Sequence, residues 1–178
     1  MQFQLTQDFP AGLQRLWTVF GRLDYPLRKY HALGATAVRV RRFHATAQAI
    51  DVELERDVAV ARSLLPVWTR ALIGDEQTLR HHTVWRRTSP TEISAELDIS
   101  PVGLPVRAHA KGTLVERTHD TSRMVLRWHV ESILGKIVER VFAKEIRGAL
   151  AADHAFTLQY LQESDRPAAR SDTHQGTP

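Results

Sequence analysis

Hydrophobic and polar residues alternate along much of the middle of the chain. Between Ala49 and Val60, five aliphatic residues alternate with four acidic ones, and Arg56 alone interrupts the aliphatic side of the pattern. The same period of two residues recurs at Thr91–Ile99 and Arg123–Glu131, and it is typical of strands with one buried face. Weaker patterns of the same kind predict further strands at 1–7, 36–44, 76–87 and 105–117.

Short polar segments such as Ala45-Thr46 and Thr88-Ser89-Pro90 separate the predicted strands. Links this short favour hairpins, so the pattern predicts an antiparallel meander with one polar face and one face that must be covered. Several of these strands are about 10 to 13 residues long, and strands longer than the usual five or six tend to curl.

The segment from Lys136 to Gln162 predicts a long helix that covers the apolar face of this sheet. It contains no proline, and its apolar residues recur at helical spacing. The helix is roughly 40 Å long, which matches a strand of about 12 residues. Two shorter helices are predicted at Leu13–Phe20 and Tyr25–Leu33, the second ending at Gly34. We therefore expect an α+β fold in which a curved seven-stranded antiparallel sheet wraps a long C-terminal helix, with two short helices after the first strand.

Length and composition predict a single domain and a cytoplasmic location. A chain of 178 residues suits a single domain, which we place at 1–164, and the polar segment 165–178 is expected to be disordered. The absence of cysteine excludes disulfides and thiolate chemistry. No leader pattern and no run of about 18 apolar residues occurs, so we expect a cytoplasmic protein. The 24 basic and 20 acidic residues are interspersed and predict an ordinary solvated surface.

Several short motifs resemble those of the START-like (SRPBCC) superfamily, whose members have the helix-grip fold. They are Phe9-Pro10, Tyr25 to Gly34, Leu65-Pro66 before Trp68, Trp85, Val102 to Val106, and Leu134 to Glu139. The resemblance covers residues 1–164. More specifically, the chain resembles an uncharacterised bacterial family of that fold. The superfamily includes lipid-transfer domains, birch-pollen allergens and aromatic-polyketide cyclases. It therefore implies a cavity between the sheet and the long helix for an apolar molecule, and no catalytic residue is carried over.

We expect this cavity to bind, and in one interpretation to carry, a small hydrophobic ligand such as a lipid, sterol or polyketide. A run of small residues on one predicted strand leaves room for it, although aromatic neighbours that fill the gap would leave a packed core instead. The apolar segment 63–74 is interpreted either as a lid or as a cap on the core. The expected apolar wall consists of Trp68, Leu72, Trp85, Ala108, Ala110, Trp128, Phe142 and Phe156.

Three polar residues are candidates for orienting the ligand: Arg56, His81 and Asp153. Arg56 and His81 lie on the inward-facing side of their strands, and Asp153 lies on the apolar stripe of the long helix. Adjacent His81 and His82 point to opposite faces of a strand and therefore cannot hold one ion together. We expect no metal and no cofactor, and the sequence leaves the oligomeric state open.

Two alternative functions remain open at this point. In the first, the chain is an enzyme of the polyketide cyclase or hydratase type, in which His81 or Asp153 transfers protons in the same cavity. In the second, it is a basic interaction module with a filled core. Basic residues cluster at Arg39 to Arg42, Arg86-Arg87, Arg107 and Lys111. Transient contact with an anionic membrane fits this cluster, whereas nucleic acid is not favoured because no aromatic stacking platform accompanies it. We expect a binding protein rather than an enzyme.

Overall fold

The computed structural model describes residues 1–59 and 75–164. Within these ranges the chain forms one strand, two short helices, six further strands and a long helix, in the predicted order. The elements are β1 (Gln2–Phe9), α1 (Leu13–Phe20), α2 (Asp24–Ala32), β2 (Ala35–Ala45), β3 (Ala49–Ala59), β4 (Glu76–Ser89), β5 (Glu92–Pro101), β6 (Val106–Thr118), β7 (Thr121–Ser132) and α4 (Lys136–Ser164). The predicted lid or cap at 63–74 and the predicted disordered tail lie outside the described residues.

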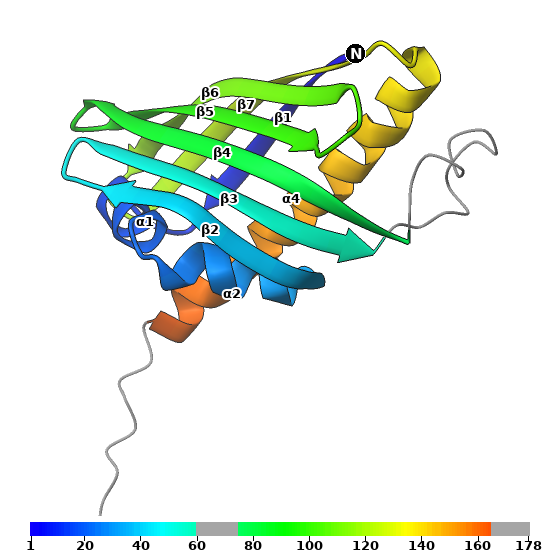
Figure 1. Ribbon diagram of the computed structural model, residues 1–178. Coiled ribbons are helices and arrows are strands. Elements are labelled where there is room, and N and C mark those ends of the chain that lie inside the picture. The colour runs from blue at the N-terminus through cyan, green and yellow to red at the C-terminus, as the bar shows by residue number, and fades with distance from the viewer. Residues whose placement is uncertain (60–74, 165–178) are drawn as a thin grey trace, which may run out of the picture.

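The seven strands form one antiparallel sheet in the order β1-β7-β6-β5-β4-β3-β2. Six consecutive strands, β2 to β7, pair in sequence order as the predicted meander, and short turns connect β2 to β3 and each successive pair from β4 to β7. β1 instead pairs with the last strand, so that Phe3 lies opposite Trp128 and Leu5 opposite Leu126. The chain then passes through α1 and α2 before it enters β2 at the other edge of the sheet (Figure 1).

The long helix α4 lies across one face of the curved sheet, while α1 and α2 lie at one end of it (Figure 1). This arrangement confirms the predicted α+β fold. The alternation along β7 explains why one face is covered: Met124, Leu126, Trp128 and Val130 are buried, and the residues between them are half-buried or exposed. Side chains of a strand point alternately to opposite faces, so one face of β7 supplies the core.

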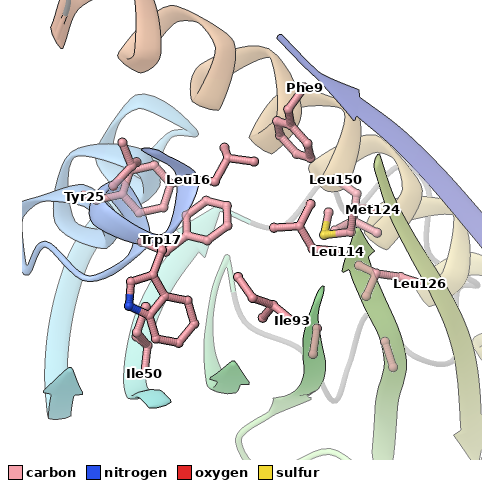
Figure 2. Packing of buried hydrophobic residues seen from close by; sticks show 14 of the residues in the cluster. Phe9, Leu16, Trp17, Tyr25, Ile50, Ile93, Leu114, Met124, Leu126 and Leu150 are labelled. Carbon is pink, nitrogen blue, oxygen red and sulfur yellow. The ribbon is translucent and has the colours of Figure 1, made fainter. Parts of the chain in front are cut away.

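The core joins α1, α4 and the inner face of the sheet. Leu13, Leu16, Trp17 and Phe20 of α1 are spaced as one helical face and are all buried. Figure 2 shows the Trp17 ring beside Ile50, and Leu16, Ile93 and Leu150 of α4 belong to the same hydrophobic cluster. The short amphipathic helix therefore closes one end of the space between sheet and helix.

Close approach of two strands explains Gly112 in β6. A Cβ atom built on Gly112 would lie 1.9 Å from the backbone oxygen of Val125 in β7. No side chain fits at that distance, so glycine is required by the backbone contact. Gly112 belongs to the run of small residues in which the sequence suggested free space, and at Gly112 the neighbouring strand occupies that space.

The outer face of the sheet carries many ion pairs. Five residues of the predicted basic cluster are paired there with carboxylates from neighbouring strands, which makes the surface mixed in sign: Arg39, Arg41, Arg42, Arg107 and Lys111. The pairs are Arg39 with Asp57, Arg41 and Arg80 with Glu55, Arg42 with Asp51, Arg107 with Asp98, and Lys111 with Glu96. Arg87 of that cluster instead lies over the Trp17 ring and donates a hydrogen bond to Gln14. No helix among the described residues is long and apolar enough to cross a membrane.

Candidate functional site

A cavity of about 110 Å³ lies between the inner face of the sheet and the helices α2 and α4. Its walls come from β1, α1, α2, four strands from β3 to β7, and α4. Most of the lining is apolar, and it includes Phe9, Phe20, Val52, Leu97, Met124 and Ile146. The volume resembles that of an engineered cavity of about 150 Å³ that binds benzene.

Helix α2 supplies one wall of this cavity. Pro26, Lys29, Tyr30 and Leu33 line it, and their spacing of i, i+3, i+4 and i+7 places them on one helical face. The Lys29 side chain is only 13% exposed, and its Nζ donates a hydrogen bond of 3.0 Å to Asp153 Oδ2 of α4. This ion pair therefore joins α2 to α4 at the cavity.

Burial alone would lower the pKa of Lys29, but the charge of Asp153 and the two neighbouring tyrosines outweigh it and raise the pKa. Lys29 is therefore charged at neutral pH. Beside it, the Tyr25 hydroxyl lies 2.7 Å from Thr157 Oγ1, which itself donates to the backbone oxygen of Asp153. Thr157 thus accepts from Tyr25, and burial raises the pKa of Tyr25, which keeps its hydroxyl protonated.

Strands β3 and β4 supply a second part of the polar wall. Arg56 Nε donates a hydrogen bond of 2.9 Å to His81 Nε2, and His81 Nδ1 lies 3.4 Å from the Tyr30 hydroxyl. Arg56 Cζ and Lys29 Nζ each lie 4.8 Å from the centre of the Tyr30 ring. Two cations from different elements therefore converge on one tyrosine of α2.

The geometry fixes the protonation of His81. A guanidinium group only donates, so Nε2 must accept and the single proton of neutral His81 lies on Nδ1. Burial, followed by the charges of Arg56 and Lys29, lowers the pKa of His81 well below its ordinary value. The imidazole lone pair is already occupied by Arg56, so His81 is not arranged to take a proton from a substrate.

The three polar residues selected from the sequence all lie at this site. His81 and Asp153 line the cavity, and Arg56, which is 8% exposed, contacts the lining residues His81 and Tyr30. His81 accepts a hydrogen bond from Arg56, whereas Asp153 accepts one from Lys29. The proposed acid and base pair thus has no direct contact among the interactions of the described residues.

Of the expected apolar wall, Trp85 lines the cavity. Ala108, Ala110 and Trp128 are instead fully buried in the core, where Ala110 lies opposite Trp128 in the register of β6 and β7. Trp128 also stacks on Phe3, so close packing rather than free volume surrounds these small residues. Phe142 and Phe156 are half-buried and pack against the core without lining the cavity. Trp68 and Leu72 lie outside the described residues.

Sequence reasoning missed the contribution of α2, namely Tyr25, Lys29 and Tyr30. The signal was a lysine on an otherwise apolar helical face, in the run Pro26, Lys29, Tyr30 and Leu33. It also missed Thr157, because nothing in the sequence reveals that this residue faces Tyr25, 132 positions away. No cluster of three histidine or carboxylate side chains that could hold a metal ion occurs in the described part of the chain.

The curved sheet, the long helix across it and the cavity between them define a START-like helix-grip protein. Solved structures with this fold are similar over most of the chain. Norcoclaurine synthase from Thalictrum flavum has a TM-score of 0.58 at 11% identity, covering 94% of this chain and 89% of that one. The Zhui aromatase/cyclase from a Streptomyces species has a TM-score of 0.56 at 13% identity, covering 95% and 98%. A START superfamily protein from Mycobacterium smegmatis has a TM-score of 0.54 at 12% identity, covering 92% and 98%.

Within this class the chain belongs to the family described as "Protein of unknown function (DUF2505)", whose pattern matches residues 4–161. The predicted resemblance to the START-like superfamily is thereby confirmed at the level of the fold. No curated protein matches the chain significantly. Identities this low to the solved structures establish the fold alone, so function must be argued from the site.

Proposed function

We propose that the protein binds a small, largely apolar molecule in the cavity between the sheet, α2 and α4. The observation that carries the proposal is a cavity with mainly apolar walls and a few convergent polar groups on one side. This combination is typical of small-molecule sites. The helix-grip fold agrees with it, since one similar structure, norcoclaurine synthase, was solved with dopamine and hydroxybenzaldehyde.

The cavity volume favours a compact ligand. About 110 Å³ is below the roughly 300 to 1,000 Å³ of common ligand pockets, so one aromatic ring fits better than a sterol or a long lipid. Burying about 150 Å² of apolar surface contributes roughly 4 kcal/mol, which corresponds to a dissociation constant of about 1 mM. Tighter binding therefore requires help from the polar wall.

Native mass spectrometry of the purified full chain, followed by organic extraction, tests whether a small molecule is retained. Titration with indole, followed by chemical-shift changes of cavity-lining residues, provides a defined probe. We expect saturable shifts at Trp85 and Leu97, which line the cavity from the neighbouring strands β4 and β5. Absence of both a retained molecule and saturable indole binding would contradict the proposal.

A matched pair of substitutions on α4 separates cavity binding from surface binding. Ala149 lines the cavity, whereas Ala152 of the same helix is exposed. Ala149→Leu places extra carbon atoms in the cavity and is expected to weaken indole binding at least tenfold, while Ala152→Leu leaves it unchanged. Equal effects of the two substitutions would place the indole site elsewhere.

A further inference from the structure

The polar wall of the cavity has an imbalance of charge. Lys29 and Arg56 are both cationic, Asp153 is the carboxylate bonded to Lys29, and His81 is neutral. Asp153 bonds to Lys29 and therefore offsets only one of the two cations. The buried wall formed by α2, β3, β4 and α4 therefore carries a surplus of one positive charge.

Arg56 carries this surplus. Its side chain is 8% exposed, and it forms no ion pair with any of the described residues. Nε is bonded to His81, but the two terminal nitrogens form no hydrogen bond within the described part of the chain. Burial lowers the pKa of Arg56, which reflects the cost of keeping its charge away from water. Buried charges in proteins are normally paired, so Arg56 is a candidate partner for an anionic group.

Two lining residues connect Arg56 to the cavity. Its guanidinium lies 4.8 Å from the centre of the Tyr30 ring and is bonded to His81, and both of these residues line the cavity. Because the proton of His81 lies on Nδ1, the Tyr30 oxygen is the acceptor in their contact, and the Tyr30 hydroxyl proton is available to another acceptor. The Tyr30 hydroxyl at the cavity and the terminal nitrogens of Arg56, which contacts Tyr30 and His81, are therefore two kinds of donor without an acceptor among the described residues.

We propose that the ligand carries a carboxylate, which lies at the Tyr30–His81 wall and neutralises Arg56. This inference rests on the proposed function and specifies the ligand as a small aromatic or similarly compact carboxylic acid. The terminal nitrogens of Arg56 and the hydroxyl of Tyr30 donate to the acid, and guanidinium groups match the planar geometry of a carboxylate. The apolar body of the ligand lies toward Phe20, Trp85 and Leu97.

Benzoate and benzamide test this assignment, because they have nearly the same shape and differ in charge. Binding of each to the full chain is measured at pH 7 by calorimetry or by chemical-shift titration. We expect benzoate to bind at least tenfold more tightly than benzamide. Equal affinities would overturn the carboxylate assignment and leave the proposed function intact, whereas failure of benzoate, benzamide and indole to bind would overturn both.

Substitutions of Arg56 test whether its charge causes the preference for benzoate over benzamide. Arg56→Gln removes the charge but retains a donor for His81, and it is expected to abolish the preference for benzoate over benzamide. Arg56→Lys retains the charge and is expected to restore part of the preference. Arg107→Gln, on the outer face and paired with Asp98, is the matched control and retains the full preference. A preference for benzoate that persists in Arg56→Gln would overturn the role of Arg56. The comparison of benzoate with benzamide in the unaltered chain does not depend on whether this variant folds.

Discussion

Charged side chains on the outer and inner faces of β3 lie in opposite environments. On the outer face, Asp57 accepts two hydrogen bonds from Arg39 and one from Thr78, and these lower the pKa of Asp57 to about 2. The hydrogen bond to Asp57 likewise raises the pKa of Arg39. On the inner face, burial lowers the pKa of Arg56. The outer face therefore stabilises both charged partners, whereas the inner face holds one charge at a cost.

This difference distinguishes the ordinary ion pairs of the outer surface from the buried charged residues of the candidate site. Exposed ion pairs individually contribute little to stability. A cation that is buried without a carboxylate is costly, and perturbed groups of this kind concentrate at functional sites. The inner end of β3, next to α2 and α4, is therefore the part of the molecule where we propose that a ligand binds.

The largest expected contrast concerns the carboxylates of the two faces. Asp153→Asn leaves Lys29 buried without its counter-ion and is expected to destabilise the protein by about 3 kcal/mol. Asp98→Asn removes the partner of Arg107 on the outer face and is expected to cost less than about 1 kcal/mol. Urea denaturation with both variants measures the difference.

A double substitution sharpens this result. Lys29→Met combined with Asp153→Leu removes both charges together and should recover most of the stability that Asp153→Asn loses, because no unpaired ion remains. If Asp153→Asn and Asp98→Asn shift the denaturation midpoint equally, the buried pair does not have the role described here.

A second contrast of intermediate size concerns pH. His81 has an ordinary pKa of 6.5 when unfolded and a much lower one when folded, so below pH 6.5 the unfolded state binds the extra proton. Stability is therefore expected to fall by about 2 kcal/mol between pH 7 and pH 5. The charged groups facing His81 are Arg56 of β3 and Lys29 of α2, and both oppose its protonation. Asp57 of the outer face contributes only below pH 4, since its stabilising effect is lost as pH falls through that range.

His81→Gln provides the control for this pH dependence, because glutamine retains an acceptor for Arg56 and does not titrate. The variant is expected to lose most of the slope between pH 7 and pH 5 in thermal denaturation. An unchanged slope would show that groups other than His81 cause the pH dependence.

Sequence periodicity predicted the strands, the helices and the inward position of Arg56 and His81, because side-chain direction in a strand follows from a period of two. The same reasoning did not reveal that Asp153 pairs with Lys29, 124 positions away. Periodicity assigns a residue to a face but carries no information on which distant face it meets. It also placed Ala108 and Ala110 at a cavity, whereas Trp128 and its neighbours fill that region, since free volume depends on how all side chains pack.

The smallest expected contrast compares two hydroxyl pairs of equal length. Tyr25 and Thr157 lie 2.7 Å apart inside the protein, and Thr118 and Thr121 lie 2.7 Å apart at an exposed turn. Tyr25→Phe leaves the buried Thr157 oxygen without its donor and is expected to cost about 1 kcal/mol. Thr118→Val exposes the partner hydroxyl to water, which replaces the lost bond, and is expected to change stability by less than about 0.5 kcal/mol. Urea midpoints that shift equally in the two variants would show that burial at α2 does not strengthen the contact, and would thereby weaken the distinction between the inner site and the outer surface.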